Sequence, residues 1–221
     1  SGTNTGTFTG ISFGYSTGVN IRGNSFNVST AGATLTGIST TTGVASTSAN
    51  TISGNSFSLS SSATSATSIT GISCSVGGNF QVFNNTFSAL NFTGILTTGG
   101  SETAISLNAG SSNNIYNNTI AGMTIGAATS TGSPTVAGIV VGSSTTAANV
   151  YKNRIYGITS PATGTSTLLE GIRIAGGTTI NVHNNLIGNL NATAVSSNDA
   201  IRGINITSTT TSSTVAVYYN T

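Results

Sequence analysis

The chain has 221 residues, of which only 4% are charged, and five basic against three acidic side chains give a formal net charge of +2. So few charges form no basic run, which argues against a nucleic-acid-binding surface. A single cysteine, Cys74, excludes an internal disulfide and a cysteine zinc site. The sequence contains no run of about 18 apolar residues that would predict a membrane-spanning helix.

The first predicted element of each repeated unit is a short strand that follows a Gly-Ile signature. The glycines stand at Gly10, Gly37, Gly71, Gly138, Gly171 and Gly203, and Ala104 takes the same place in the fourth unit. Apolar residues then alternate, as in Ile172 and Ile174 or Ile105 and Leu107. Alternation of this kind is typical of a strand with one buried face.

The second and third predicted strands flank one repeated asparagine. These asparagines recur every 30 to 35 residues, at Asn24, Asn55, Asn85, Asn118, Asn153, Asn185 and Asn220. A β-branched residue stands three places before each of them, as in Val182, and a Phe or Ile follows two places after the first six, as in Phe87. Each unit therefore contains three short strands.

Three strands in units of 30 to 35 residues predict a parallel β-helix, in which each coil lays its strands beside those of the next. No 3.6-residue periodicity supports helices, and the units are too short for propeller blades. We expect one all-β domain over residues 1–221, with about seven coils. The repeated asparagines are expected at a sharp, left-handed bend, with their amides hydrogen-bonded in a ladder along the rod.

The Gly-Ile-x-apolar and Asn-Val-Tyr-x-Asn-x-Ile signatures resemble the right-handed parallel β-helix repeats of the pectin-lyase-like superfamily. Segments such as NVHNNLIGNL and STVAVYYNT are similar to Thr/Asn/Gly-rich repeat regions of large bacterial surface proteins exported by the type IX route. The resemblance spans essentially the whole chain. It implies right-handed winding, an extracellular location and, often, a very long parent protein.

Five aromatic or imidazole side chains form the clearest candidate binding surface. They stand two places before the repeated asparagine, at Phe83, Tyr116, Tyr151, His183 and Tyr218. By strand alternation this row faces outward, where the rings either stack on one another or stack on sugars, and mutual stacking is the simpler interpretation. His183 has no second metal-ligating residue at suitable spacing, so we read it as a member of this row.

The acidic residues offer little support for catalysis, although many pectin-lyase-like proteins cut acidic polysaccharides. Glu102 and Glu170 are expected two coils apart, a spacing loosely compatible with an inverting carboxylate pair. The better expected partner of Glu170 is Arg202, in an exposed ion pair. Cys74 is expected to be buried and inert. We therefore predict no catalytic residues, no metal site and no cofactor.

The predicted rod shows no polar cap at either end, which indicates head-to-tail self-association or continuation into a longer rod. Uneven Ser/Thr/Gly loops at 124–137 and 159–168 suit display or adhesion. We expect a secreted, non-enzymatic structural or adhesive element of a surface fibre, stalk or filament. Carbohydrate binding along the aromatic row is the alternative, and a polysaccharide lyase or hydrolase and ice binding are weaker ones.

Overall fold

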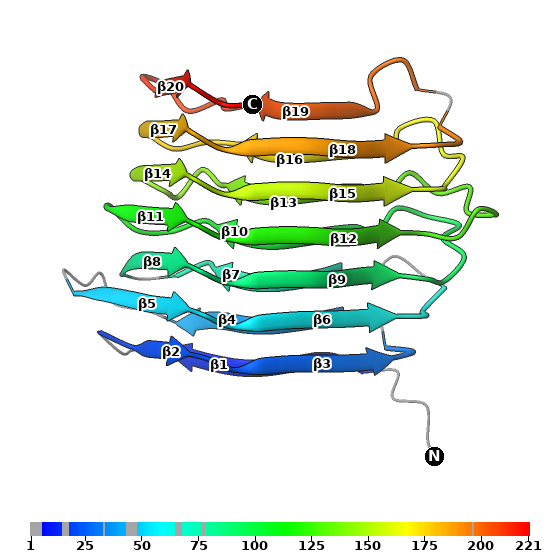
Figure 1. Cartoon of the computed structure of the whole chain (residues 1–221), viewed down its shortest axis with the longest axis horizontal. Helices are drawn as coiled ribbons and strands as arrows, with labels where there is room; N and C mark the ends of the chain where they lie inside the picture. Colours follow the sequence, from blue (N-terminus) through cyan, green and yellow to red (C-terminus); the bar gives the residue numbers. More distant parts are fainter. Residues whose placement is uncertain are drawn as a thin grey trace.

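A computed structural model describes residues 6–14, 18–32, 34–42, 48–64, 68–76, 78–195 and 197–221. All regular structure in these ranges is β-strand, arranged in three parallel sheets that wrap around one core. Successive coils lie one above the other from the N-terminal to the C-terminal end (Figure 1). The predicted parallel β-helix is confirmed.

Each coil contributes one strand to each sheet. The first sheet contains β1 (Phe8–Gly14), β4 (Thr34–Thr42), β7 (Ser68–Cys74), β10 (Ser101–Leu107), β13 (Thr135–Val141), β16 (Leu168–Ile174) and β19 (Ile201–Ile206). The second contains β2 (Asn20–Arg22), β5 (Ala49–Ser53), β8 (Asn79–Phe83), β11 (Asn113–Tyr116), β14 (Ala147–Tyr151), β17 (Thr179–His183) and β20 (Thr214–Tyr218). The third contains β3 (Ser25–Thr30), β6 (Ser56–Ser61), β9 (Thr86–Phe92), β12 (Thr119–Ile125), β15 (Arg154–Ser160) and β18 (Leu186–Ala192).

The first and second sheets have seven strands and the third has six, so the described chain makes six complete turns and a seventh without its third strand. This refines the expected count of about seven coils. The winding is right-handed, the usual hand for connections between parallel strands. The loops expected at 124–137 and 159–168 are shorter, 126–134 and 161–167, because the flanking strands extend further into the polar sequence.

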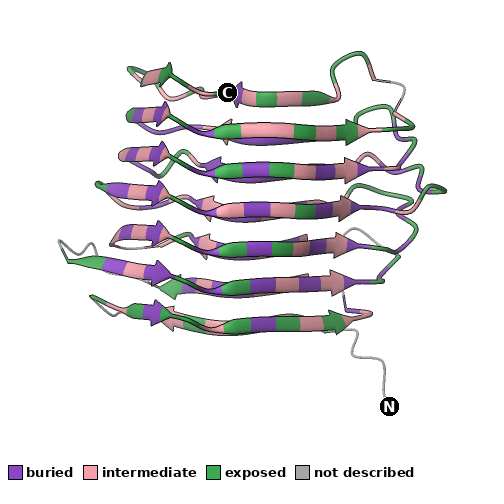
Figure 2. Cartoon of the chain, in the orientation of Figure 1, coloured by how far each residue is buried: buried purple, intermediate pink, exposed green. Residues whose placement is uncertain are grey.

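The core consists of rows of like side chains, one row for each inward strand position. Ile38, Ile72, Ile105, Ile139 and Ile172 are in register on neighbouring strands and are fully buried. The rings of Phe26, Phe57 and Phe87 stack at 4.9 and 4.7 Å between centroids. Burial of each such side chain stabilises the fold by about 1.5 to 3 kcal/mol before chain entropy is subtracted. Buried positions recur along the strands of the inner coils (Figure 2).

The Gly-Ile signature is explained by packing across this core. A Cβ atom on Gly71 would lie 2.7 Å from the carbonyl oxygen of Ala104 and still closer to the ring of Phe87. Gly37 and Gly171 are crowded in the same way by Phe57 and Ile187. Glycine therefore recurs because the residue two places after the repeated asparagine packs directly against the first sheet.

Candidate functional site

The repeated asparagines form a continuous hydrogen-bonded ladder, as predicted. The backbone N–H and Nδ2 of Asn118 both donate to Oδ1 of Asn153, at 3.1 and 3.0 Å. Nδ2 of Asn118 also donates to the carbonyl oxygen of Val82 at 3.0 Å. The same pattern runs from Asn24 to Asn220, and the five inner asparagines are at most 2% exposed. The side-chain amides of the ladder are therefore hydrogen-bonded within the rod, to one another and to backbone carbonyl groups.

The left-handed bend lies one residue earlier than expected. Positive φ angles occur at Asn84 (55°), Asn117 (53°) and Lys152 (56°), each directly before a ladder asparagine. In the other coils the residue before the ladder asparagine also has a positive φ, and these residues are Gly23, Gly54, Asn184 and Tyr219. The ladder asparagines themselves are not in this conformation, and their side chains hold the turn through hydrogen bonds. Assignment of the bend to the ladder asparagines was therefore wrong by one position.

The predicted aromatic row is a continuous stack on the second sheet. Ring centroids of Phe83, Tyr116, Tyr151, His183 and Tyr218 are 4.8, 5.0, 5.2 and 4.9 Å apart, with interplanar angles of 4 to 10°. Partial burial raises the pKa of Tyr151, and the neighbouring Tyr116 raises it further by a smaller amount. The inner rings use their faces on each other, so a ligand can reach their edges. Tyr218, at the end of the stack, is 43% exposed and contacts the ring of Tyr219 in a T-shaped arrangement, with 5.5 Å between centroids.

The expected ion pair between Glu170 and Arg202 does not form, although their Cα atoms are partners on neighbouring strands. Glu170 pairs instead with Arg173, at 3.3 Å between Oε2 and Nη1, and accepts a hydrogen bond from Nδ2 of Asn205. Nε of Arg202 donates to both Asp199 carboxylate oxygens at 3.1 Å, which lowers the pKa of Asp199. Each arginine therefore pairs with a carboxylate three residues before it in the same coil, and no ion pair joins Glu170 to Arg202 in the next coil.

Glu102 is a buried carboxyl group in an otherwise apolar row. It stands in register with Ile69 and Val136, is fully buried, and neither carboxyl oxygen has a hydrogen-bond partner of normal geometry. Burial raises its pKa well above the usual value, and the Phe92 backbone offsets this only in part. Glu102 is therefore retained as the neutral acid over a wide pH range.

Glu102 and Glu170 do not form a catalytic pair. Glu102 lies in the row of Val136, whereas Glu170 lies in the next row, that of Ala137. Because successive side chains of a strand point to opposite faces, the two carboxyl groups lie on opposite sides of the first sheet. Within the described ranges no three His, Cys, Asp or Glu side chains are grouped as a metal site. Cys74 is buried, as expected, and burial raises the pKa of its thiol.

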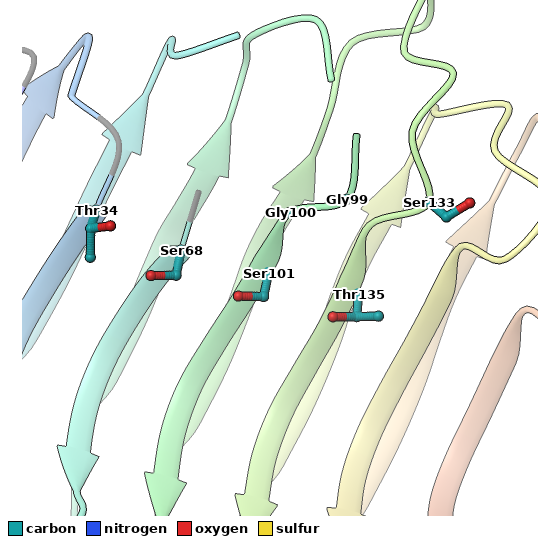
Figure 3. A pocket seen from close by; sticks show the side chains of 7 residues that line it. All are labelled: Thr34, Ser68, Gly99, Gly100, Ser101, Ser133 and Thr135. Carbon is teal, nitrogen blue, oxygen red and sulfur yellow. The ribbon is translucent and has the colours of Figure 1, made fainter. Parts of the chain in front are cut away.

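A shallow groove of about 470 Å³ lies over the beginning of the first sheet (Figure 3). Its floor is a row of hydroxyl groups in register on four neighbouring strands, and the loops beside it add Gly99, Gly100 and Ser133. The row comprises Thr34, Ser68, Ser101 and Thr135. No charged side chain lines the groove, so it offers hydrogen bonds but no acid, base or activated nucleophile.

Sequence reasoning missed this groove, although its signal was visible. A Ser or Thr stands three places before the Gly-Ile position, or before Ala104, in four consecutive units. A Thr follows two places later in three of them, at Thr36, Thr70 and Thr103. In so Ser/Thr-rich a chain this periodicity is hard to distinguish from composition until the coils are in register.

Comparison with protein-family models, with curated proteins and with solved structures finds no match. None of the described residues belongs to a helix of the length and apolarity needed to span a membrane. The class defined by the fold is therefore a parallel β-helix with an asparagine ladder.

Proposed function

We propose that this chain is a structural, non-catalytic element of an extracellular surface fibre, stalk or filament. The observation that supports it is the set of axial ladders: inward rows, ladder amides and ring faces are all used by neighbouring coils. The scarcity of charge and the pairing of Glu170 with Arg173 and of Asp199 with Arg202 favour the same conclusion.

The resemblance to pectin-lyase-like repeats and to surface proteins of the type IX route supports an extracellular location. Uneven Ser/Thr/Gly loops on the surface of the rod suit adhesion, because loops of solenoids vary without disturbing the coils. The parent protein then uses these coils as a spacer that holds an adhesive surface away from the cell.

Immunolabelling of intact cells of the source organism, viewed by electron microscopy, tests this proposal. Label on fibres or stalks outside the cell is the expected result. Label confined to the cell interior would overturn it. Cleavage of any member of a panel of acidic and neutral polysaccharides by the purified chain would overturn the non-catalytic assignment.

Carbohydrate binding is a second candidate, and the hydroxyl groove is the observation that favours it. Its row of Ser and Thr hydroxyls follows the rod over four strands and can hydrogen-bond an extended polymer. A glycan array compares the two surfaces: loss of binding in Ser68→Ala and Ser101→Ala assigns the ligand to the groove. Loss in Tyr116→Ala and Tyr151→Ala assigns it to the aromatic row, and no binding by the unmodified chain removes this candidate.

A further inference from the structure

Glu102 is a buried titratable group that the ladders and the ion pairs leave unpaired. It is fully buried, and neither carboxyl oxygen has a hydrogen-bond partner of normal geometry. Its row continues as Ile69 in β7 and Val136 in β13. The strands β7, β9, β12 and β13 pack against β10, and among their side chains only Cys74 is also titratable, at the opposite end of β7 in register with Leu107. No cation on these strands compensates a negative charge on Glu102.

The segment directly before Glu102 is weakly anchored. Glu102 is the second residue of β10 and follows loop 93–100, which contains no titratable side chain. Leu96 provides the one fully buried side chain of this loop. The backbone of Leu96 bonds to the next coil, donating its N–H to Oγ of Ser130 at 2.8 Å and accepting from the N–H of Gly132 at 2.9 Å. A segment with a single buried anchor opens at a lower cost in free energy than the strands beside it.

The same segment forms part of the hydroxyl groove. Gly99 and Gly100 line the groove beside Ser101 (Figure 3). The carbonyl oxygen of Gly100 accepts a hydrogen bond from the N–H of Thr135 at 2.9 Å, and Thr135 also lines the groove. Ser101 faces the groove, whereas Glu102, the next residue of the strand, faces the core. Displacement of residues 93–102 therefore removes part of the groove and an acceptor of its neighbouring strand.

We infer that Glu102 makes the hydroxyl groove sensitive to pH: ionisation of the buried carboxyl group opens residues 93–102, and the groove is complete only in the protonated, closed state. An unpaired charge in an apolar interior is unstable until it reaches water, and the adjoining loop is the segment whose opening exposes it at the lowest cost. The opening itself is independent of the structural function proposed above. It rests on the carbohydrate candidate only for the ligand of the groove.

The direction of the pH dependence follows from proton binding. Burial raises the pKa of Glu102 above the ordinary value of 4.5, so the closed state holds the proton more tightly than the open state. Raising the pH therefore favours the open state. Between pH 4.5 and the closed-state pKa, the ratio of open to closed molecules rises up to about tenfold per pH unit.

Hydrogen–deuterium exchange with mass spectrometry tests this inference on the unmodified chain and on Glu102→Gln, from about pH 5 to about pH 8. Comparing the two proteins at each pH cancels the pH dependence of intrinsic amide exchange. Peptides within 93–107 should exchange progressively faster in the unmodified chain, by up to about tenfold per pH unit. Residues 161–174 are the internal control, because they form the equivalent loop and strand two coils away, with Leu169 in the row of Glu102. They should exchange alike in both proteins.

Moving the carboxyl group to the next coil sharpens the test. Val136→Glu combined with Glu102→Leu places it in the same row behind loop 126–134, and the pH-dependent exchange should move from 93–107 to 126–141. If circular dichroism shows that this variant does not fold, the comparison with Glu102→Gln decides alone.

Two results overturn the inference. One is an equal rise of exchange with pH in the unmodified chain and in Glu102→Gln, and the other is a rise shared equally by 93–107 and 161–174, which would indicate global unfolding. Either result leaves carbohydrate binding to the glycan array and the surface location to immunolabelling.

Discussion

The two sides of each coil differ in how strictly their length is kept. Between the second and third strands there are always two residues, a left-handed residue and the ladder asparagine, as in Asn84 and Asn85. Between the third strand and the next coil the connection varies from three residues, 31–33, to nine, 126–134. Both connections carry the chain around a corner of the same rod.

The difference shows that a ladder of side-chain hydrogen bonds repeated in every coil, and not the corner itself, restricts chain length. The ladder joins every coil to the next through donors and acceptors spaced at the strand separation, so one added residue would break two bonds. The opposite connections also contain hydrogen bonds between coils, such as that from the backbone N–H of Leu96 to Ser130, but no side chain there repeats from coil to coil as the ladder asparagine does. Such loops absorb insertions at little cost in free energy.

The largest expected effect is that of breaking the ladder at its centre. Asn118→Ala leaves the backbone N–H of Asn85 without its acceptor and the carbonyl of Val82 without its donor. Buried groups left unpaired cost about 1 to 3 kcal/mol each, so the free energy of unfolding should fall by roughly 3 to 5 kcal/mol. Denaturant unfolding measures it, with the exposed Asn27→Ala as a control expected within about 0.5 kcal/mol. Equal losses in both variants would contradict a special role for the ladder.

Crowding across the core should produce the next largest effect. Gly71→Ala places a methyl group against the ring of Phe87 and the carbonyl of Ala104, and overpacking of this kind costs about 1 to 3 kcal/mol. Gly188→Ala is the control, because a Cβ atom there has no neighbour within 4 Å in the described structure. Thermal unfolding of the two variants should give a clearly lower Tm for Gly71→Ala alone. An unchanged Tm would mean that the third sheet shifts freely to make room.

Substitution of Glu102 should increase stability, whereas the two preceding substitutions should decrease it. Glu102 is the first inward residue after the variable loop 93–100. Glu102→Leu should raise the free energy of unfolding by about 1 to 2 kcal/mol near neutral pH, since it removes an unpaired buried carboxyl group from an apolar row. The folded state holds the Glu102 proton more tightly than the unfolded state, because burial raises the pKa of this group. Stability of the unmodified chain therefore falls as the pH rises from about 4.5 toward the folded pKa.

Glu102→Gln separates these two contributions. It keeps the shape of the side chain but cannot titrate, so its stability should lack the decline between acid and neutral pH. Denaturant unfolding at several pH values compares it with the unmodified chain. A decline of the same size in Glu102→Gln would assign the pH dependence to another group.

The smallest expected effect tests the left-handed position before the ladder. Lys152 holds a φ of 56° where other coils use Gly or Asn, and Asn adopts this conformation more readily than Lys. Lys152→Asn should raise the free energy of unfolding by about 0.5 to 1 kcal/mol, and Lys152→Ala should not raise it. A gain from Ala equal to that from Asn would point to removal of charge and not to relief of backbone strain.

Much of this molecule was predictable from sequence because like residues occupy like places. A repeat of 30 to 35 residues combined with strand alternation predicts the inward rows, the buried Cys74, the asparagine ladder and the aromatic stack. The errors lie where a local contact competes with a contact between coils. Arg202 forms an ion pair with Asp199, three residues away, and Arg173 forms one with Glu170. Repeat spacing could not rank these partners, since it says nothing of side-chain rotamers.

The sequence by itself determined the winding of the chain, because its periodic apolar residues can all be buried together only when each unit stacks on the one before. The tertiary structure decided which residue of each Asn-containing turn bends the backbone, why glycine recurs opposite Phe and Ile, and that a row of hydroxyl groups forms a groove. These features depend on distances between atoms of different coils. Such distances exist only once the coils are in register.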